Sequence, residues 1–138
     1  MRVYGMPLIV SMPSLYSYSL KRIQMKENII LIKSINFSVR IKNYCNGLYS
    51  KRESIIANQL LRCGLAIGAN ISEAQQAESR SDFIHKMKIA SKEASETSYW
   101  LSICEKIATG GFQIELMNEL NQIVAILSKI IISAKRNA

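Results

Sequence analysis

Apolar residues recur along most of this chain at spacings of three and four, the period of an α-helix, and short breaks divide the pattern into four stretches. Gly47 follows the first stretch, as glycine often follows a helix, and Gly110-Gly111 separates the third from the fourth. Capping-box patterns begin at Ser50 and Ser79, at the start of the second and third stretches. The predicted helices cover about 28–46, 50–76, 79–108 and 113–135.

The fourth stretch has the most regular apolar seam. Its positions follow a 4-3-4-3-4 rhythm, the spacing of a helix in a bundle: Leu116, Leu120, Ile123, Leu127, Ile130 and Ala134. Proline, the strongest helix breaker, occurs only at Pro7 and Pro13, before the helical stretches. Because short connections between long helices make neighbours antiparallel, the sequence predicts an all-α, antiparallel up-down-up-down four-helix bundle.

Small residues mark one face of the second stretch, where Gly64, Gly68 and Ser72 recur every fourth residue. A glycine within a helix costs about 1 kcal/mol relative to alanine, so we expect close packing against another helix to offset that cost. Polar groups lie near small residues in the second and third stretches, and we interpret them as structural contacts rather than as a catalytic carboxylate cluster. They are Arg62, Asn70, Glu73, Glu93 and Glu96, with a buried contact expected from Asn70 to Glu93 or Glu96.

The first stretch is apolar on more than one side. One stripe contains Ile30, Phe37, Ile41, Tyr44 and Leu48, and a second, on a different side, contains Ile32, Ile35 and Val39. In a four-helix monomer each helix should keep a wide polar face, so the second stripe predicts a further partner. The fourth stretch repeats the pattern, with apolar residues beside its seam at Met117, Val124 and Ile131. We therefore expect a homo-oligomer.

The first residues differ from the rest of the chain. Residues 1–24 contain both prolines and no acidic residue, and we expect them to be an unstructured leader or the product of a start codon placed too early. Residues 25–138 then form the bundle domain. Because no run reaches the roughly 18 apolar residues of a membrane span, no membrane partner is expected.

The cysteines point to a reducing compartment. Cys45, Cys63 and Cys104 are odd in number, widely spaced and lack a C-x-x-C pair, which argues against a disulfide framework and against a zinc site. We expect three buried thiols in a cytoplasmic protein.

Basic residues are concentrated on the first helix and the turn after it. The whole chain carries a net charge of +8, and between Met25 and Arg62 seven basic residues stand against Glu27 and Glu53. Lys26, Lys33 and Arg40 are seven residues apart and so share one helix face, where cations can neutralise successive phosphates. A solvated face of a basic protein is the alternative. The candidate nucleic-acid-binding residues are Lys26, Lys33, Arg40, Lys42, Lys51 and Arg52.

Several short motifs follow one another through the helical region. They are Gln59-Leu60-Leu61-Arg62, Gly68-Ala69-Asn70-Ile71-Ser72-Glu73-Ala74, Ser81-Asp82-Phe83, and Ala90-Ser91-Lys92-Glu93-Ala94 with Glu96, Tyr99 and Trp100. From Met25 to about Ala134 the chain resembles the bacterial 23S rRNA intervening-sequence proteins, a family that includes accessory proteins of diversity-generating retroelements. The resemblance implies a bundle assembled into a ring, a pentamer, with a basic character suited to nucleic acid. It implies no established catalytic activity.

The sequence contains few motifs of the kinds that form catalytic or metal sites. His85 is the lone histidine, and the chain has neither the paired Glu-x-x-His motifs of di-iron bundles nor a phosphate-binding glycine loop. We therefore expect no catalytic residue, no metal, no cofactor and no enzymatic activity. Tyr99 and Trp100 lie beside core positions and are expected to be structural.

Two function classes remain open. The first is an oligomer that binds RNA or DNA phosphates, as an accessory to a reverse transcriptase or to rRNA processing. The alternative is a structural or protein-interaction scaffold with no nucleic-acid binding.

Overall fold

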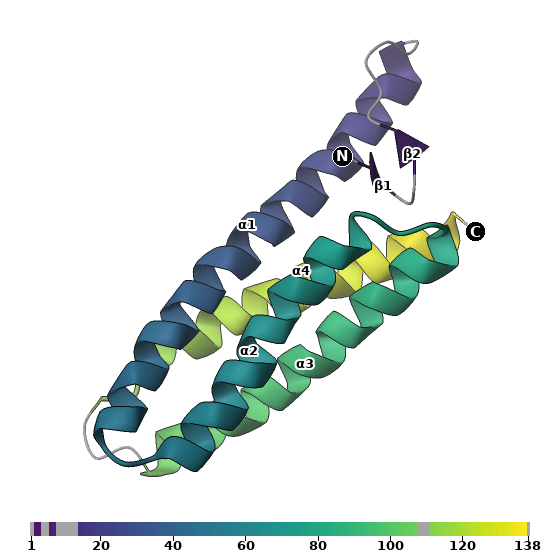
Figure 1. Cartoon of the computed structure of the whole chain (residues 1–138). Coiled ribbons are helices and arrows are strands. Elements are labelled where there is room, and N and C mark those ends of the chain that lie inside the picture. Colours follow the sequence, from purple (N-terminus) through teal and green to yellow (C-terminus); the bar gives the residue numbers. More distant parts are fainter. Residues whose placement is uncertain (1, 4–5, 8–13, 108–110, 138) are drawn as a thin grey trace.

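The structure, a computed structural model, describes the backbone at residues 2–3, 6–7, 14–107 and 111–137, and side chains at 29–107 and 111–137. These residues contain four helices and a short pair of strands (Figure 1). The helices are α1 (Ser14–Ser50), α2 (Ser54–Ala74), α3 (Arg80–Ile107) and α4 (Ile114–Arg136). The strands β1 (Arg2–Val3) and β2 (Met6–Pro7) pair antiparallel.

Each helix packs against its neighbours in the chain, and α4 returns to pack against α1. Consecutive helices run in opposite directions, so that α1 descends, α2 ascends, α3 descends and α4 ascends in the view of Figure 1. The predicted all-α, up-down-up-down bundle is confirmed.

Apolar side chains from all four helices fill the space between them. Phe37 of α1, Leu60 and Ile67 of α2, and Phe83 and Leu101 of α3 are fully buried. The predicted α4 seam is buried along its whole length. Within the described residues α4 is also the one helix long and apolar enough to cross a membrane by composition. Packing of its seam in the bundle core accounts for only part of that apolar character, because 33% of the apolar window is buried.

The first helix is longer than its sequence pattern predicted. It begins at Ser14 and ends at Ser50, so residues 14–24, expected to be unstructured, belong to α1. The N-terminal part of α1 extends past the ends of the other helices (Figure 1). The division of the chain into a leader and a bundle domain stays a prediction.

The turn between α1 and α2 differs from the prediction in its details. Gly47 lies inside α1 rather than after it. Ser50 does not cap α2, whose N-cap is Glu53, and Glu53 makes no side-chain cap bond. The turn closes instead through Arg52, whose φ of 62° lies in the left-handed region, with the Glu53 amide donating to the Leu48 carbonyl at 2.9 Å. A left-handed residue after the last turn is a common way to end a helix.

The start of α3 follows the predicted capping pattern more closely. The Asp82 amide donates to the Ser79 hydroxyl oxygen at 3.0 Å, and the Asp82 carboxylate accepts from the Glu78 amide at 3.2 Å. The Asp82 amide lies in the first turn of α3 and the Glu78 amide just before it, where the helix itself has no carbonyl to accept their hydrogen bonds.

Candidate functional site

The outer face of α1 carries apolar side chains that no other helix covers. Ile32, Ile35 and Val39 are 58%, 53% and 55% exposed, whereas Ile30 and Ile41 are fully buried. The two stripes predicted for this helix therefore lie on opposite sides, one in the core and one in solvent. We call Ile32, Ile35 and Val39 the outer apolar face.

Two of the predicted phosphate-binding cations make contacts within the chain. The Lys33 ammonium donates to the Gln122 side-chain oxygen at 3.2 Å, and Arg40 forms an ion pair with Glu119. These contacts join α1 to α4 beside a cavity of about 290 Å³. Because the Glu119 carboxylate compensates the Arg40 charge, the cationic strip is weaker than its sequence indicates.

The other predicted cations are not gathered on that side. Lys42 is nine residues from Lys33, which places it on the opposite flank of α1. Lys51 and Arg52 are exposed in the turn after α1. Within the described side chains none of these three forms an ion pair. Lys26 lies in α1, but its side chain is outside the described side chains.

The polar groups of α2 and α3 form two separate contacts. Arg62 pairs with Glu96 and lies 3.7 Å from the Glu93 carboxylate, and Lys86 donates to Glu73 at 3.0 Å. The expected contact from Asn70 to Glu93 or Glu96 is not formed. The Asn70 amide donates instead to the Ala66 carbonyl of its own helix at 2.8 Å, a local bond open to asparagine in any helix.

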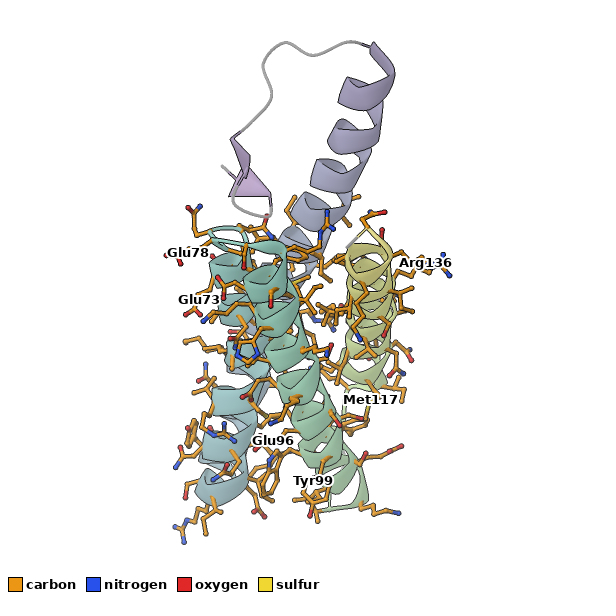
Figure 2. The ribbon with its side chains drawn as sticks, turned by 90° about the vertical axis from the view of Figure 1, so that its right-hand side faces the viewer. Glu73, Glu78, Glu96, Tyr99, Met117 and Arg136 are labelled. Atoms are coloured by element: carbon orange, nitrogen blue, oxygen red, sulfur yellow. The ribbon has the colours of Figure 1, made fainter. Side chains whose placement is uncertain are left out.

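The outer surface of α3 was misread from the sequence at one position. Tyr99, labelled in Figure 2, was expected to be structural but is 61% exposed. Its ring meets that of Trp100 edge-on, with the ring centroids 5.3 Å apart. Trp100 is half-buried, and its indole N–H donates to Glu96 at 3.4 Å. The signal that could have identified the surface is the spacing of four and seven residues that relates Lys88, Lys92 and Tyr99 and puts them on one helix face.

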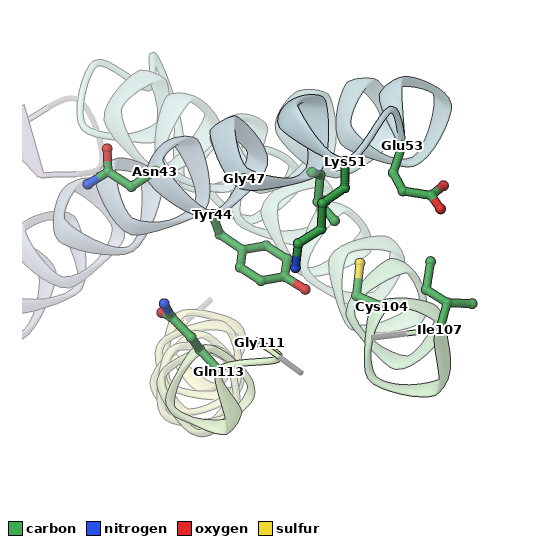
Figure 3. A pocket seen from close by; sticks show the side chains of 10 residues that line it. Asn43, Tyr44, Gly47, Lys51, Glu53, Cys104, Ile107, Gly111 and Gln113 are labelled. Atoms are coloured by element: carbon green, nitrogen blue, oxygen red, sulfur yellow. The ribbon is translucent and has the colours of Figure 1, made fainter. Parts of the chain in front are cut away.

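A cavity of about 300 Å³ opens where the α1–α2 turn approaches the end of α3 (Figure 3). Tyr44, Lys51 and Cys104 line it. Burial raises the pKa of the Tyr44 hydroxyl and of the Cys104 thiol above their ordinary values. Both groups therefore stay protonated at neutral pH, which disfavours a nucleophilic role.

All three cysteines are buried and free, as predicted. Burial, together with the neighbouring Cys104 and Cys63, raises the pKa of Cys45 to about 12. Within the described residues no three His, Cys, Asp or Glu side chains are grouped so as to hold a metal ion. His85 is exposed on α3.

Comparison with known proteins identifies relatives of the whole bundle. Residues 26–133 match the family described as 23S rRNA-intervening sequence protein. A solved structure from Bacteroides thetaiotaomicron, described as a protein with unknown function from the S23 ribosomal protein family, is 42% identical, with a TM-score of 0.71. That match covers 77% of this chain and 97% of the other. No curated protein matches the chain.

The family match spans α2, α3 and almost all of α4, together with the part of α1 from residue 26 onward. The resemblance inferred from the short motifs is confirmed. The chain belongs to the 23S rRNA-intervening sequence protein family.

Proposed function

We propose that this protein is a homo-oligomer that associates with the phosphate backbone of RNA or DNA and acts by binding rather than by catalysis. The observation that carries the proposal is the outer apolar face of α1. Three aliphatic side chains there are each more than half exposed, on the helix side opposite the core. Burying apolar surface stabilises association by about 25 cal/mol per Å², so an assembled state would remove this surface from water favourably.

A second copy of the chain is the proposed occupant of that face. The N-terminal part of α1 continues beyond the bundle and adds helix length on which a partner can pack (Figure 1). A ring needs a heterologous contact, in which the outer apolar face of one copy packs against a different surface of the next, and such contacts close when the rotation between copies allows it. Five copies is the number that the family resemblance implies, and a ring of five is our proposal for the assembly.

Charge supports the nucleic-acid part of the proposal. The chain carries a net charge of +8, and Lys42, Lys51 and Arg52 are exposed without an ion-pair partner among the described side chains. A ring would repeat each cation in every copy, so a weak charge per subunit becomes a strong one per assembly. We further propose a cytoplasmic location, which suits the three free thiols, and a reverse transcriptase or another protein as a partner.

One observation favours the scaffold alternative. Arg40 and Lys33 are engaged by Glu119 and Gln122, so the strip that the sequence assigned to phosphates is partly used in holding α1 to α4. On this alternative the ring presents a surface to a protein and binds no nucleic acid.

The mass of the full chain in solution tests the assembly. Light scattering at micromolar concentration should return an oligomer, and replacing Ile35 and Val39 together by glutamate should return a monomer of unchanged helix content. Ile132→Glu is the matched control, because Ile132 is 52% exposed on α4 and lies outside the outer apolar face. A monomeric mass for the wild-type protein would overturn the proposal.

A further inference from the structure

One face of α3 combines cations, hydroxyls and an aromatic ring. Its residues are spaced alternately by three and four, so they lie in one line along the helix. They are His85, Lys88, Lys92, Ser95, Tyr99, Ser102 and Lys106, and all are exposed except the half-buried Ser102. We call this set the α3 outer stripe. It faces solvent on the side of α3 opposite the core residues Ala90, Ala94 and Leu101.

The charge of this stripe is available to a ligand. Lys88, Lys92 and Lys106 form no ion pair with any side chain that the structure describes. The nearest acidic neighbour by helix geometry is Glu96, which flanks the stripe and is paired with Arg62. In this respect the stripe differs from the α1 strip, where Glu119 compensates Arg40.

Tyr99 supplies a flat surface beside these cations. Its ring rests edge-on against Trp100, and Trp100 is held in turn by its hydrogen bond to Glu96. The ring is thus supported from within the protein while most of its surface meets water (Figure 2). An exposed, supported aromatic ring among lysines is the arrangement on which unpaired bases stack in single-strand-binding proteins.

We propose that the α3 outer stripe binds a single strand of RNA or DNA, with the three lysines on phosphates and the Tyr99 ring stacked on a base. The inference rests on the proposed nucleic-acid function and names its ligand class and its surface. From Lys88 to Lys106 the helix is about 27 Å long, the length of roughly eight stacked nucleotides. A duplex fits less well, because its bases are paired and stacked within the helix and offer Tyr99 no free face.

Fluorescence anisotropy of the full chain with labelled oligo-dT, oligo-U and a DNA duplex of equal length tests the lysines. Lys88→Gln with Lys92→Gln should flatten the slope of log affinity against log salt for the single strands by about 1.4, because each lost phosphate contact removes about 0.7. The matched control is Lys129→Gln with Lys135→Gln, which removes the same charge from exposed positions on α4. The control should leave the slope nearly unchanged.

Two variants of Tyr99 test the stacking surface separately from charge. Tyr99→Ala should weaken single-strand binding at least about fivefold at constant salt, and Tyr99→Phe should retain it, because stacking needs the ring and not the hydroxyl. Neither variant should change duplex binding. A thermal melt followed by circular dichroism verifies that both variants keep the fold.

The outcomes separate this inference from the proposed function. If the wild-type chain binds no nucleic acid at about 50 mM salt, both fail. If it binds, the stripe is not the binding surface when the α3 double substitution and the α4 control substitution weaken binding equally, or when Tyr99→Ala has no effect. In either case the proposed function stands. If Tyr99→Ala weakens duplex and single-strand binding alike, the assignment of a single strand is overturned.

Discussion

A β-carbon placed on Gly64 of α2 would lie 2.9 Å from Cγ2 of Ile41 on α1. That separation is shorter than real β-carbons show, and Ile41 is fully buried with a branched side chain that has few alternative rotamers. A β-carbon placed on Gly68, one turn further along α2, would lie 3.2 Å from the Ser34 hydroxyl oxygen. The small residues of α2 thus allow α1 to approach closely, as their spacing predicted.

Gly64→Ala should therefore destabilise the protein, although alanine favours a helix by about 1 kcal/mol. Over-packing of a tight core contact costs about 1–3 kcal/mol, which exceeds the gain in propensity. Gly47→Ala is the control, because Gly47 lies in α1 with no atom of the described residues within 4 Å of its β-position, and it should stabilise the protein. Urea unfolding measures both variants, and a gain in stability for Gly64→Ala would contradict the close approach.

Arg62→Met should lower the free energy of unfolding by about 1–2 kcal/mol. One Glu93 oxygen is buried without a hydrogen bond, and Arg62 at 3.7 Å is the cation beside it, so the variant leaves that carboxylate oxygen unpaired. Lys86→Met removes the pair with Glu73, a residue 60% exposed, and should have no measurable effect. Equal losses of unfolding free energy in the two variants would show that the burial of Glu93 does not make its contact with Arg62 more stabilising.

Stability should fall at alkaline pH through Cys45. Its pKa is raised from 9.0 to about 12 in the folded state. Between those values the unfolded thiol ionises and the folded one does not, so a contribution fully present below pH 9 is lost as pH rises, by about 1.4 kcal/mol per pH unit. Cys45→Ala should lose less stability than the wild type between pH 8 and about 10.5 in urea titrations. Identical losses would refute the assignment to Cys45.

Deletion of residues 1–24 should leave the cooperative unfolding transition in place. The buried core residue nearest the N-terminus among the described side chains is Ile30, which the deletion retains. Differential scanning calorimetry of the truncated chain measures the transition. Its disappearance would show that the bundle depends on the N-terminal part of α1.

The sequence predicted the fold best where the periodic pattern was long and uninterrupted. The α4 seam from Leu116 to Ala134 is buried as expected, because six apolar positions at bundle spacing leave one choice of inner face. Gly47 was misread because glycine marks helix ends often but not always. The helix α1 continues through Gly47 at a small cost in propensity, and no described atom lies within 4 Å of its β-position.

The candidate surfaces were predictable in part. The exposure of Ile32, Ile35 and Val39 followed from the two-sided pattern of α1. The partner of Arg40 could not be foreseen, because Glu119 is 79 residues away and the pair depends on how α1 and α4 pack. Tyr99 was misjudged because its place beside core residues in the chain was considered without the helix period, which puts it on the side of α3 opposite Ala94 and Leu101.

Sedimentation velocity of the full chain with a labelled single-stranded oligonucleotide at about 50 mM salt tests the central claim most directly. We expect the label to sediment with protein at the mass of an oligomer, and to be released as the salt concentration rises. A label that stays free beside the assembled protein would contradict nucleic-acid binding and favour the scaffold alternative. A label carried by a species of monomer mass would contradict the claim that the assembly is the binding form.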